Sequence, residues 1–273
     1  MSDIIEKLEL KATQLRKDVL QVVYESKAGH IGGSLSSMDI LTTLYYNVLN
    51  VNPNEPNNPD RDRFILSKGH IAESLYCILA DKGYFNKDKL KTYSKFNSTL
   101  IGHPNIKNPG VEINTGSLGH GLSISVGIAL AGKKDKKDYK VFTLMGDGEQ
   151  AEGSIWEAAM SAANYKLDNL VAIVDRNGLQ ISGATEDVMA LEDLSGKWTK
   201  FGWNVIKVDG NSIEELLKVF NYIPKVKDKP TMIIAKTIKG KGISFMENNA
   251  KWHHGVPTEE QYVQAMKELE KGC

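Results

Sequence analysis

The spacing of apolar residues divides the chain into alternating helices and short strands. Apolar side chains recur every three or four positions, as on one face of a helix, over residues 4–26, 38–49, 71–82, 90–96, 122–131, 155–163, 198–201, 213–222 and 259–270. Short β-branched runs that suit buried strands begin near residues 63, 141, 170, 203 and 230. Helices that alternate with short strands predict an α/β fold.

The clearest unit runs from Tyr139 to Ser182. A strand over residues 141–145 ends at Gly146-Asp147-Gly148, a helix follows, and a second strand over residues 170–174 ends in Asp175-Arg176-Asn177-Gly178. Two strands joined by one helix form a parallel βαβ unit, and ligands of such sheets bind beyond the carboxyl ends of the strands. We therefore expect Asp147 and Asn177 to reach one point in space.

A carboxylate, an amide oxygen and a nearby backbone carbonyl form a small set of hard oxygen ligands, which suits Mg²⁺ or Ca²⁺. Such a set leaves coordination positions for phosphate and water. Gly146 and Gly148 allow the backbone to approach a ligand closely. A lone Gly-Asp-Gly is more often a surface turn, and the Asn at the end of the next strand is what favours a metal site.

Composition excludes several other classes of protein. The chain has 273 residues, with 34 basic and 34 acidic side chains, so bulk charge predicts neither a nucleic-acid partner nor a membrane surface. Its two cysteines, Cys77 and Cys273, are not a disulfide framework. The N-terminal stretch has no apolar signal core, and no stretch is long and apolar enough to span a membrane. These features predict a cytoplasmic protein.

Five of the six histidines are next to a glycine, where a turn brings an imidazole close to a ligand; they are His30, His70, His103, His120 and His254. The sixth is His253. A zinc site is the competing explanation, but no pair shows helical ligand spacing and no cysteine is nearby.

Two glycine-rich stretches are candidate anion-binding sites. Thr115 to Gly121 precedes the predicted helix over residues 122–131, whose N-terminus suits a diphosphate, although a helix packed only for stability fits equally well. Lys239-Gly240-Lys241-Gly242 lacks the spacing of a Walker motif, so a P-loop is rejected. Ser36 or Ser37 is a candidate cap for the helix over residues 38–49.

The segment GDGEQAEGSIWEAA, followed by Asn177, resembles the thiamine-diphosphate motif of the transketolase family. Four more segments resemble that family: AGHIGGSLS, LSKGHIAESLY, TGSLGHG and KWHHGVP. Together they cover about the first 250 residues. The resemblance implies the thiamine-diphosphate-binding fold, a three-layer α/β sandwich around a mostly parallel sheet. It also implies transfer of a two-carbon ketol unit between sugar phosphates, as in the pentose phosphate pathway.

By that resemblance the metal ligands are Asp147, Asn177 and the carbonyl of Leu179. Glu152 is expected in the acidic network that couples two cofactor sites across a subunit interface. Further cofactor contacts are expected from His70, Gly116, Ser117, Leu118, Gly146 and Gly148.

The resemblance also assigns proton transfer to three histidines, His30, His103 and His254, because an imidazole titrates near neutrality. His253 is the alternative to His254. His120 stands where better-known members carry glutamine, and its role stays open.

One diphosphate-binding domain is expected over residues 1–273, with a helical arm at about 1–27 and a helical tail at about 257–273. In this family a second domain supplies the activating glutamate and the arginines that hold the sugar phosphate. The four arginines here, Arg16, Arg61, Arg63 and Arg176, do not match that clamp. We therefore predict the N-terminal subunit of a split transketolase, active in an α₂β₂ assembly with a C-terminal subunit; part of a longer chain would give the same pattern.

Two alternatives remain. One is half of another thiamine-diphosphate enzyme, such as deoxyxylulose-phosphate synthase or a dehydrogenase E1 component, although Glu152 and Trp156-Glu157 favour transketolase. The other is a cofactor-binding subunit without catalysis, which would have no need of proton-handling histidines. The sequence identifies neither the sugars nor the metal, which is Mg²⁺, Ca²⁺ or Mn²⁺.

Overall fold

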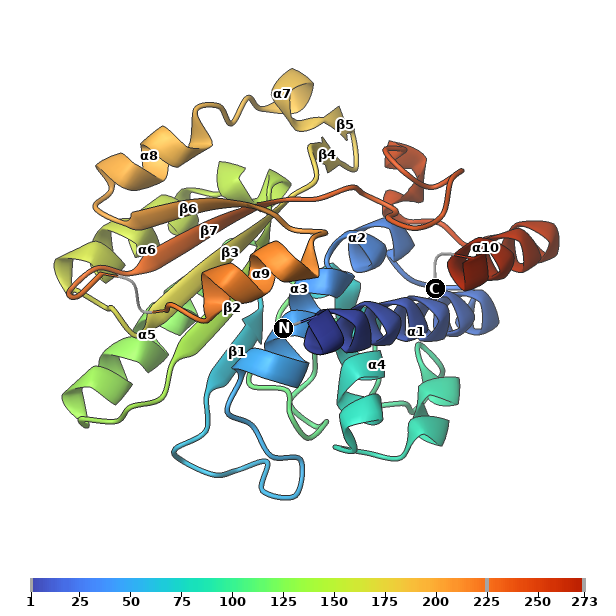
Figure 1. Cartoon of the computed structure of the whole chain (residues 1–273), viewed down its shortest axis with the longest axis horizontal. Helices are drawn as coiled ribbons and strands as arrows, with labels where there is room; N and C mark the ends of the chain where they lie inside the picture. The colour runs from blue at the N-terminus through green and yellow to red at the C-terminus, as the bar shows by residue number, and fades with distance from the viewer. Residues whose placement is uncertain (1, 224–225, 272–273) are drawn as a thin grey trace.

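A five-stranded parallel sheet lies between two layers of helices in the computed structural model, which describes residues 2–223 and 226–271 (Figure 1). The strands lie in the order β1-β2-β3-β7-β6, and every neighbouring pair is parallel. Their bounds are β1 Arg63–Leu66, β2 Val141–Gly146, β3 Leu170–Arg176, β6 Asn204–Asp209 and β7 Thr231–Lys236. The predicted three-layer α/β sandwich is confirmed.

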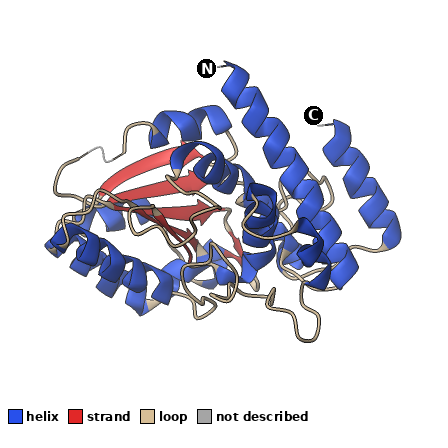
Figure 2. Cartoon of the chain, turned by 90° about the horizontal axis from the view of Figure 1, so that it is seen from below, coloured by secondary structure: helices blue, strands red, loops and turns tan. Residues whose placement is uncertain are grey.

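Both faces of the sheet are covered, which explains why its central strands are almost continuously apolar. Successive side chains point to opposite faces: Phe142 and Leu144 enter one core, whereas Val141 and Met145 enter the other. Figure 2 shows the sheet between the two groups of helices. The first core includes α1 Ser2–Ser26, α3 Met38–Thr43, α4 Ala72–Lys82 and α9 Ile213–Phe220, and the second includes α5 His120–Lys134, α6 Gly153–Asn164 and α8 Leu194–Lys200.

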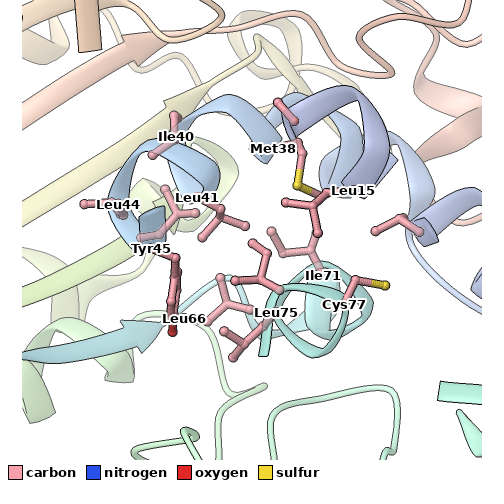
Figure 3. Close-up of a cluster of buried hydrophobic side chains, with 14 of the residues drawn as sticks. Leu15, Met38, Ile40, Leu41, Leu44, Tyr45, Leu66, Ile71, Leu75 and Cys77 are labelled. Atoms are coloured by element: carbon pink, nitrogen blue, oxygen red, sulfur yellow. The ribbon is translucent and has the colours of Figure 1, made fainter. Parts of the chain in front are cut away.

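Side chains from α1, α3, α4 and β1 converge in the first core (Figure 3). Leu15, Met38 and Ile71 are fully buried there. Each such side chain contributes about 1.5–3 kcal/mol through the removal of apolar surface from water. Cys77 lies in the same cluster as a free thiol, and burial raises its pKa well above the usual value. Cys77 therefore acts as a small apolar residue, while Cys273 lies outside the described residues.

The two long helices near the ends of the chain lie side by side (Figures 1 and 2). α10 Glu259–Lys271 packs along α1, and the rings of Tyr24 and Tyr262 stack with centroids 4.3 Å apart. The predicted closing helix is confirmed. The segment before α10 returns to α2 Ile31–Ser36, since the N–H of Gly240 donates to the carbonyl of Gly32 at 2.9 Å.

Two local predictions were wrong, and one predicted helix is present with a change of geometry. The helix expected over residues 90–96 is a 3₁₀ segment, Lys87–Thr92, that starts at an Asn86 cap. The helix expected over residues 38–49 changes from α to π geometry at Leu44–Val48. Neither Ser36 nor Ser37 caps it, because α2 Ile31–Ser36 precedes it directly and both hydroxyls donate elsewhere.

The segment after β3 contains elements too short for any periodic signal. β4 Leu179–Gln180 pairs antiparallel with β5 Gly183–Ala184, and α7 Thr185–Val188 follows. In Figure 1 these elements lie beyond the sheet, at the top of the view. None of the helices in the described part of the chain has the length and apolar character required to cross a membrane.

Candidate functional site

A cavity of about 330 Å³ opens at the carboxyl ends of β2, β3 and β7. This is the edge where an open α/β sheet binds its ligands. Residues from seven separate segments line it: Lys68, His70, His103, Gly116, Leu118, Gly146, Asp147, Gly148, Glu149, Asn177, Leu179, Gln180, Ile181, Lys239 and His253. We call the acidic and amide groups that follow β2 and β3 the floor, and the imidazoles the histidine wall.

Asp147 is the central group of the floor and is only 2% exposed. One carboxylate oxygen accepts from the N–H of Gly148 at 2.8 Å, and the other accepts from the N–H of Gly178 at 2.6 Å. Burial and the negative charge of Asp175 raise the pKa of Asp147, while Gly178 and Arg176 act against them. The predicted meeting of Asp147 with the end of β3 is therefore present.

Asn177 and Leu179 complete a set of oxygen donors beside Asp147. The side-chain oxygen of Asn177 accepts from the N–H of Leu179 at 3.1 Å, and the carbonyl of Leu179 accepts from the ammonium of Lys239 at 3.2 Å. One buried carboxylate with an amide and a carbonyl oxygen suits a hard cation such as Mg²⁺. A cation site is expected to attract positive groups, and one of these oxygens already accepts from an ammonium.

The described residues contain no group of three or more His, Cys, Asp or Glu side chains placed to hold a metal ion. The oxygen donor set is the candidate metal site because of its own chemistry.

Glu149 joins three segments of the cavity, and no motif in the sequence singles it out. Its carboxylate accepts from the N–H groups of Gly119 at 2.8 Å and Gly146 at 3.0 Å, and from the hydroxyl of Ser67 at 2.5 Å. Burial raises its pKa against these hydrogen bonds. Glu149 therefore fixes the glycine-rich loop onto the end of β2.

A buried ion pair lies beneath the floor. Lys68 donates to Asp175 at 2.5 Å, and the same carboxylate oxygen accepts from Ser36 and Ser37 at 2.6 and 2.8 Å. Burial opposes ionisation of Asp175, but the charge of Lys68 and these hydroxyls outweigh it and hold the pKa of Asp175 below its usual value. The pair connects the ends of β1 and β3 to α2.

The glycine-rich loop approaches the cavity as its sequence predicts. Gly116 has φ +142°, and a β-carbon there would lie 2.8 Å from the ring of His103, so no side chain fits. Leu118 lines the cavity. Ser117 is exposed, and Glu152 is exposed at the start of α6; neither belongs to the lining.

The histidine wall brings together residues that are more than 200 positions apart in the chain. The ring of His30 lies 5.2 Å from that of His70, 5.7 Å from that of His253 and 4.7 Å from that of His254, between centroids. His70 stacks on His253 at 5.2 Å. His30 and His254 are not among the lining residues, and the Nδ1 of His30 is buried without a hydrogen-bond partner among the described residues.

Burial lowers the pKa values of four of these imidazoles, which favours their neutral form. Burial, with the charges of His254 and His103, lowers the pKa of His30 to about 4. Burial and the charge of Lys239 lower the pKa of His253 to about 3. Burial also lowers the pKa values of His70 and His103. A neutral imidazole has one donor and one acceptor, so each ring is suited to pass a proton or to orient a hydroxyl.

The neighbouring histidines His253 and His254 differ in position. His253 lines the cavity and shares a 3.1 Å hydrogen bond with Lys239. His254, which the sequence favoured, is exposed, and its ring is close to that of His30. His120 is exposed at the start of α5, with its ring 3.2 Å from the carbonyl of Leu118.

Helix α4 anchors two of the histidine loops, which no sequence pattern indicated. The fully buried carboxylate of Glu73 accepts from the N–H of His30 at 2.7 Å and from the hydroxyl of Ser34 at 2.8 Å. One turn later, the hydroxyl of Tyr76 donates to the carbonyl of His103 at 2.7 Å. The spacing of His30 and His103 is thus fixed by side chains of one helix.

The chain is similar to known proteins over nearly its whole length. The family model described as "Transketolase, thiamine diphosphate binding domain" matches residues 8–270. The chain is 53% identical over 265 residues to one subunit of the apulose-4-phosphate transketolase of Phocaeicola vulgatus, covering 97% of this chain and 94% of that protein. It is 42% identical to 6-deoxy-6-sulfo-D-fructose transketolase subunit SqwG of Clostridium sp., covering 97% and 96%.

Longer relatives match through part of their length. Human transketolase is 41% identical over 250 residues, which are 91% of this chain and 40% of that protein. The solved structure of transketolase from Campylobacter jejuni superposes with a TM-score of 0.92 at 34% identity, covering 97% of this chain and 43% of that one. The chain therefore spans nearly all of the relatives that are themselves single subunits, and about two fifths of the longer transketolases.

Proposed function

The chain belongs to the transketolase family, and from this premise we propose that it is the N-terminal subunit of a split transketolase. The chain would transfer a two-carbon ketol unit from a ketose phosphate to an aldose phosphate, together with a separate C-terminal subunit, as a cytoplasmic α₂β₂ assembly. The observation that carries the proposal is one cavity lined both by Asp147, Asn177 and Leu179 and by three histidines whose pKa values burial lowers, namely His70, His103 and His253. A binding subunit without catalysis has no need of that wall.

The floor fits the diphosphate end of thiamine diphosphate and its metal ion. Asp147, Asn177 and the carbonyl of Leu179 would hold a divalent cation, and Gly116, Leu118 and His70 would contact the diphosphate. When bound, the cofactor supplies the electron sink that makes cleavage of a ketose carbon–carbon bond feasible. Mg²⁺ is our choice of metal, with Ca²⁺ and Mn²⁺ as the other candidates.

The histidine wall would bind and orient the sugar. His103, which lines the cavity, and the neighbouring pair His30 and His254 would exchange protons with the hydroxyl and carbonyl oxygens of the substrate. Because the fold keeps His30 and His103 neutral, each accepts a proton without first losing one. His253 is a further candidate for this work because it lines the cavity.

The names of the relatives support a choice of substrate class. Two single-subunit relatives, 53% and 47% identical, are named for apulose 4-phosphate, and a third for 6-deoxy-6-sulfo-D-fructose. We propose a ketose phosphate donor and take apulose 4-phosphate as the first compound to test. Ser117 and Glu152, which are exposed, would meet the cofactor and the neighbouring subunit only in the assembly.

The test is a coupled ketol-transfer assay with thiamine diphosphate and Mg²⁺, run on this chain alone, on its partner alone and on the mixture. The proposal expects activity in the mixture only. Apulose 4-phosphate, xylulose 5-phosphate and the sulfosugar would be compared as donors. An active chain without a partner would contradict the split assembly, and a mixture inactive with every ketose would contradict ketol transfer.

A further inference from the structure

Helix α4 buries a carboxyl group completely within a largely apolar stretch. Glu73 is 0% exposed, and the nearby Ala72 and Leu75 are buried as well. A buried carboxyl group lowers stability unless hydrogen bonds replace its contacts with water, so an apolar side chain would be less costly at this position. Burial raises the pKa of Glu73, and the hydrogen bonds that the group accepts act against this effect. Its partners therefore indicate what the carboxyl group does.

The first oxygen of this carboxyl group holds the loop that carries His30. Oε1 accepts from the N–H of His30 at 2.7 Å and from the hydroxyl of Ser34 at 2.8 Å. Gly29, with φ +147°, allows the loop to come this close, because a β-carbon there would lie 3.2 Å from Oε1 and 2.6 Å from a methyl carbon of Val23. Glu73 thus fixes the backbone on which the imidazole of His30 is mounted.

The second oxygen holds the start of the segment that leads to His103. Oε2 accepts from the hydroxyl of Tyr93 at 3.0 Å. The N–H of the next residue, Ser94, donates to the carbonyl of Leu100 at 2.8 Å, and Leu100 is fully buried. His103 follows three residues later and lines the cavity. One carboxyl group therefore joins the loops of two histidines that are 73 positions apart in the chain.

We propose that Glu73 is a positioning residue of ketol transfer, which couples the loop of His30 to the loop of His103 so that both imidazoles meet the donor ketose at a fixed separation. Glu73 is not among the lining residues, and it acts only through the two loops. A small misplacement of a group that reacts with the sugar lowers turnover strongly. The floor is held by other contacts, so cofactor binding should not depend on Glu73. This inference rests on the proposed function.

The test compares steady-state kinetics of the reconstituted complex for Glu73→Met and Glu73→Gln, with thermal melts to check the fold. Methionine has a similar length but no strong acceptor, so kcat should fall about 30-fold while the KM for thiamine diphosphate changes less than about twofold. Glutamine keeps an oxygen toward His30 and Ser34 and turns its amide N–H toward Tyr93, whose hydroxyl can accept. Glu73→Gln should therefore restore kcat to within about threefold of the wild type.

Two further variants break the link from its ends and decide the question if Glu73→Met does not fold. Ser34→Ala and Tyr93→Phe should each lower kcat about fivefold. The double variant should lose clearly less than the product of the two effects, because either change alone uncouples the loops. The matched control is Tyr45→Phe, a buried tyrosine of the same core whose ring packs on Phe64 at 5.4 Å, and it should leave kcat unchanged.

Three results would overturn the inference while the wild-type complex stays active. The first is an unchanged kcat in Glu73→Met, or in both Ser34→Ala and Tyr93→Phe. The second is Glu73→Gln as impaired as Glu73→Met, since charge and not position would then matter. The third is a double variant whose two losses multiply, since the loops would then be positioned independently. A wild-type complex that transfers no ketol unit would instead contradict the proposed function, and the inference would fall with it.

Discussion

The floor and the histidine wall face each other across one cavity, but they are built in different ways. The floor consists of groups directly at the ends of β2 and β3, and its carboxylates Asp147 and Glu149 are satisfied by backbone N–H groups. The wall consists of imidazoles on loops, and its rings are neutral because burial removes their charge. The floor thus provides charged and polar groups that bind a metal ion and its diphosphate, whereas the wall provides proton donors and acceptors.

The two regions also differ in what positions them. Parallel strands in register fix the floor, since β2 and β3 pair along their whole length up to Gly146 and Asp175. Side chains of α4 and a segment near the end of the chain fix the wall. Substitutions in the floor should therefore abolish cofactor binding, while substitutions behind the wall should alter turnover more than cofactor binding.

The largest effect is expected from Asp147→Asn. The change removes the only carboxylate of the proposed metal site, and the affinity for Mn²⁺ should fall by roughly 100-fold or more. This loss is larger than is usual when a residue that only hydrogen-bonds to a metal ligand is replaced. Ketol transfer in the reconstituted complex should disappear, with the fold intact by circular dichroism. Asp135→Asn, at an exposed position after α5, is the control. Normal metal binding by Asp147→Asn would place the metal elsewhere.

Glu149→Gln should weaken the floor by a smaller amount. An amide in place of the carboxylate turns a donor toward N–H groups that need an acceptor, and the free energy of unfolding should fall by about 2–3 kcal/mol. Urea denaturation checks this, and calorimetry should show weaker binding of thiamine diphosphate in the same variant. If stability is retained, the contacts of Glu149 with Gly119 and Gly146 contribute little.

Tyr76→Phe tests whether the wall is positioned from behind. Loss of the hydrogen bond to the carbonyl of His103 should cost about 1 kcal/mol of stability. Steady-state kinetics should show kcat reduced about tenfold, since small misplacement of a catalytic group is expensive. The KM for thiamine diphosphate should not change. Tyr165→Phe, which alters an exposed tyrosine, is the control. An altered cofactor KM would contradict the division between floor and wall.

The wall should also make the protein sensitive to acid. The pKa values of His30 and His253 are about 4 and 3 in the fold, against 6.5 in a free imidazole, so between pH 6.5 and these values the unfolded chain binds more protons. The contribution of the two neutral histidines to the free energy of unfolding is complete above pH 6.5. It is lost as the pH falls from 6.5 toward their pKa values in the fold. Melting temperatures at pH 7.5 and 5 should fall less in His253→Gln than in the wild type. An equal fall would show that His253 is not kept neutral.

The smallest effect is expected at His120. Its side chain is exposed and contacts only Leu118 and Ser117 among the described residues, so His120→Ala should change stability by less than about 0.5 kcal/mol. Titration with thiamine diphosphate should give an unchanged affinity. A clear loss would extend the cofactor site beyond the floor to the start of α5.

The sequence predicted the floor better than the wall, for a physical reason. Asp147 and Asn177 follow apolar strands directly, so strand pairing alone brings them together. The partners of the wall come from tertiary packing: nothing local distinguishes Glu73 on α4 from an ordinary helical glutamate. Lys239 belongs to a segment that fails as a Walker motif, yet its ammonium reaches the cavity. His253 and His254 are adjacent, and only the path of the chain decides which one enters the lining.

Elements were predicted best where apolar periodicity is long. α1, α9 and α10 and all five strands of the main sheet were found within a few residues. The helix expected over residues 90–96 failed because only part of the segment packs against the core, and Ser94 adopts a positive φ of 57° that ends the turn. β4, β5 and α7 are too short for a periodic pattern to form.

The strand order has a consequence for the growing polypeptide. β7 lies between β3 and β6 although it is the last of the five strands to be synthesised, so until residue 236 has left the ribosome β3 has an open edge and β6 has no partner strand. Open edges of apolar strands invite pairing with other chains. A nascent chain that stalls before β7 therefore exposes the unpaired edges of both β3 and β6. Aggregation during synthesis is avoided only if the final strand is added promptly.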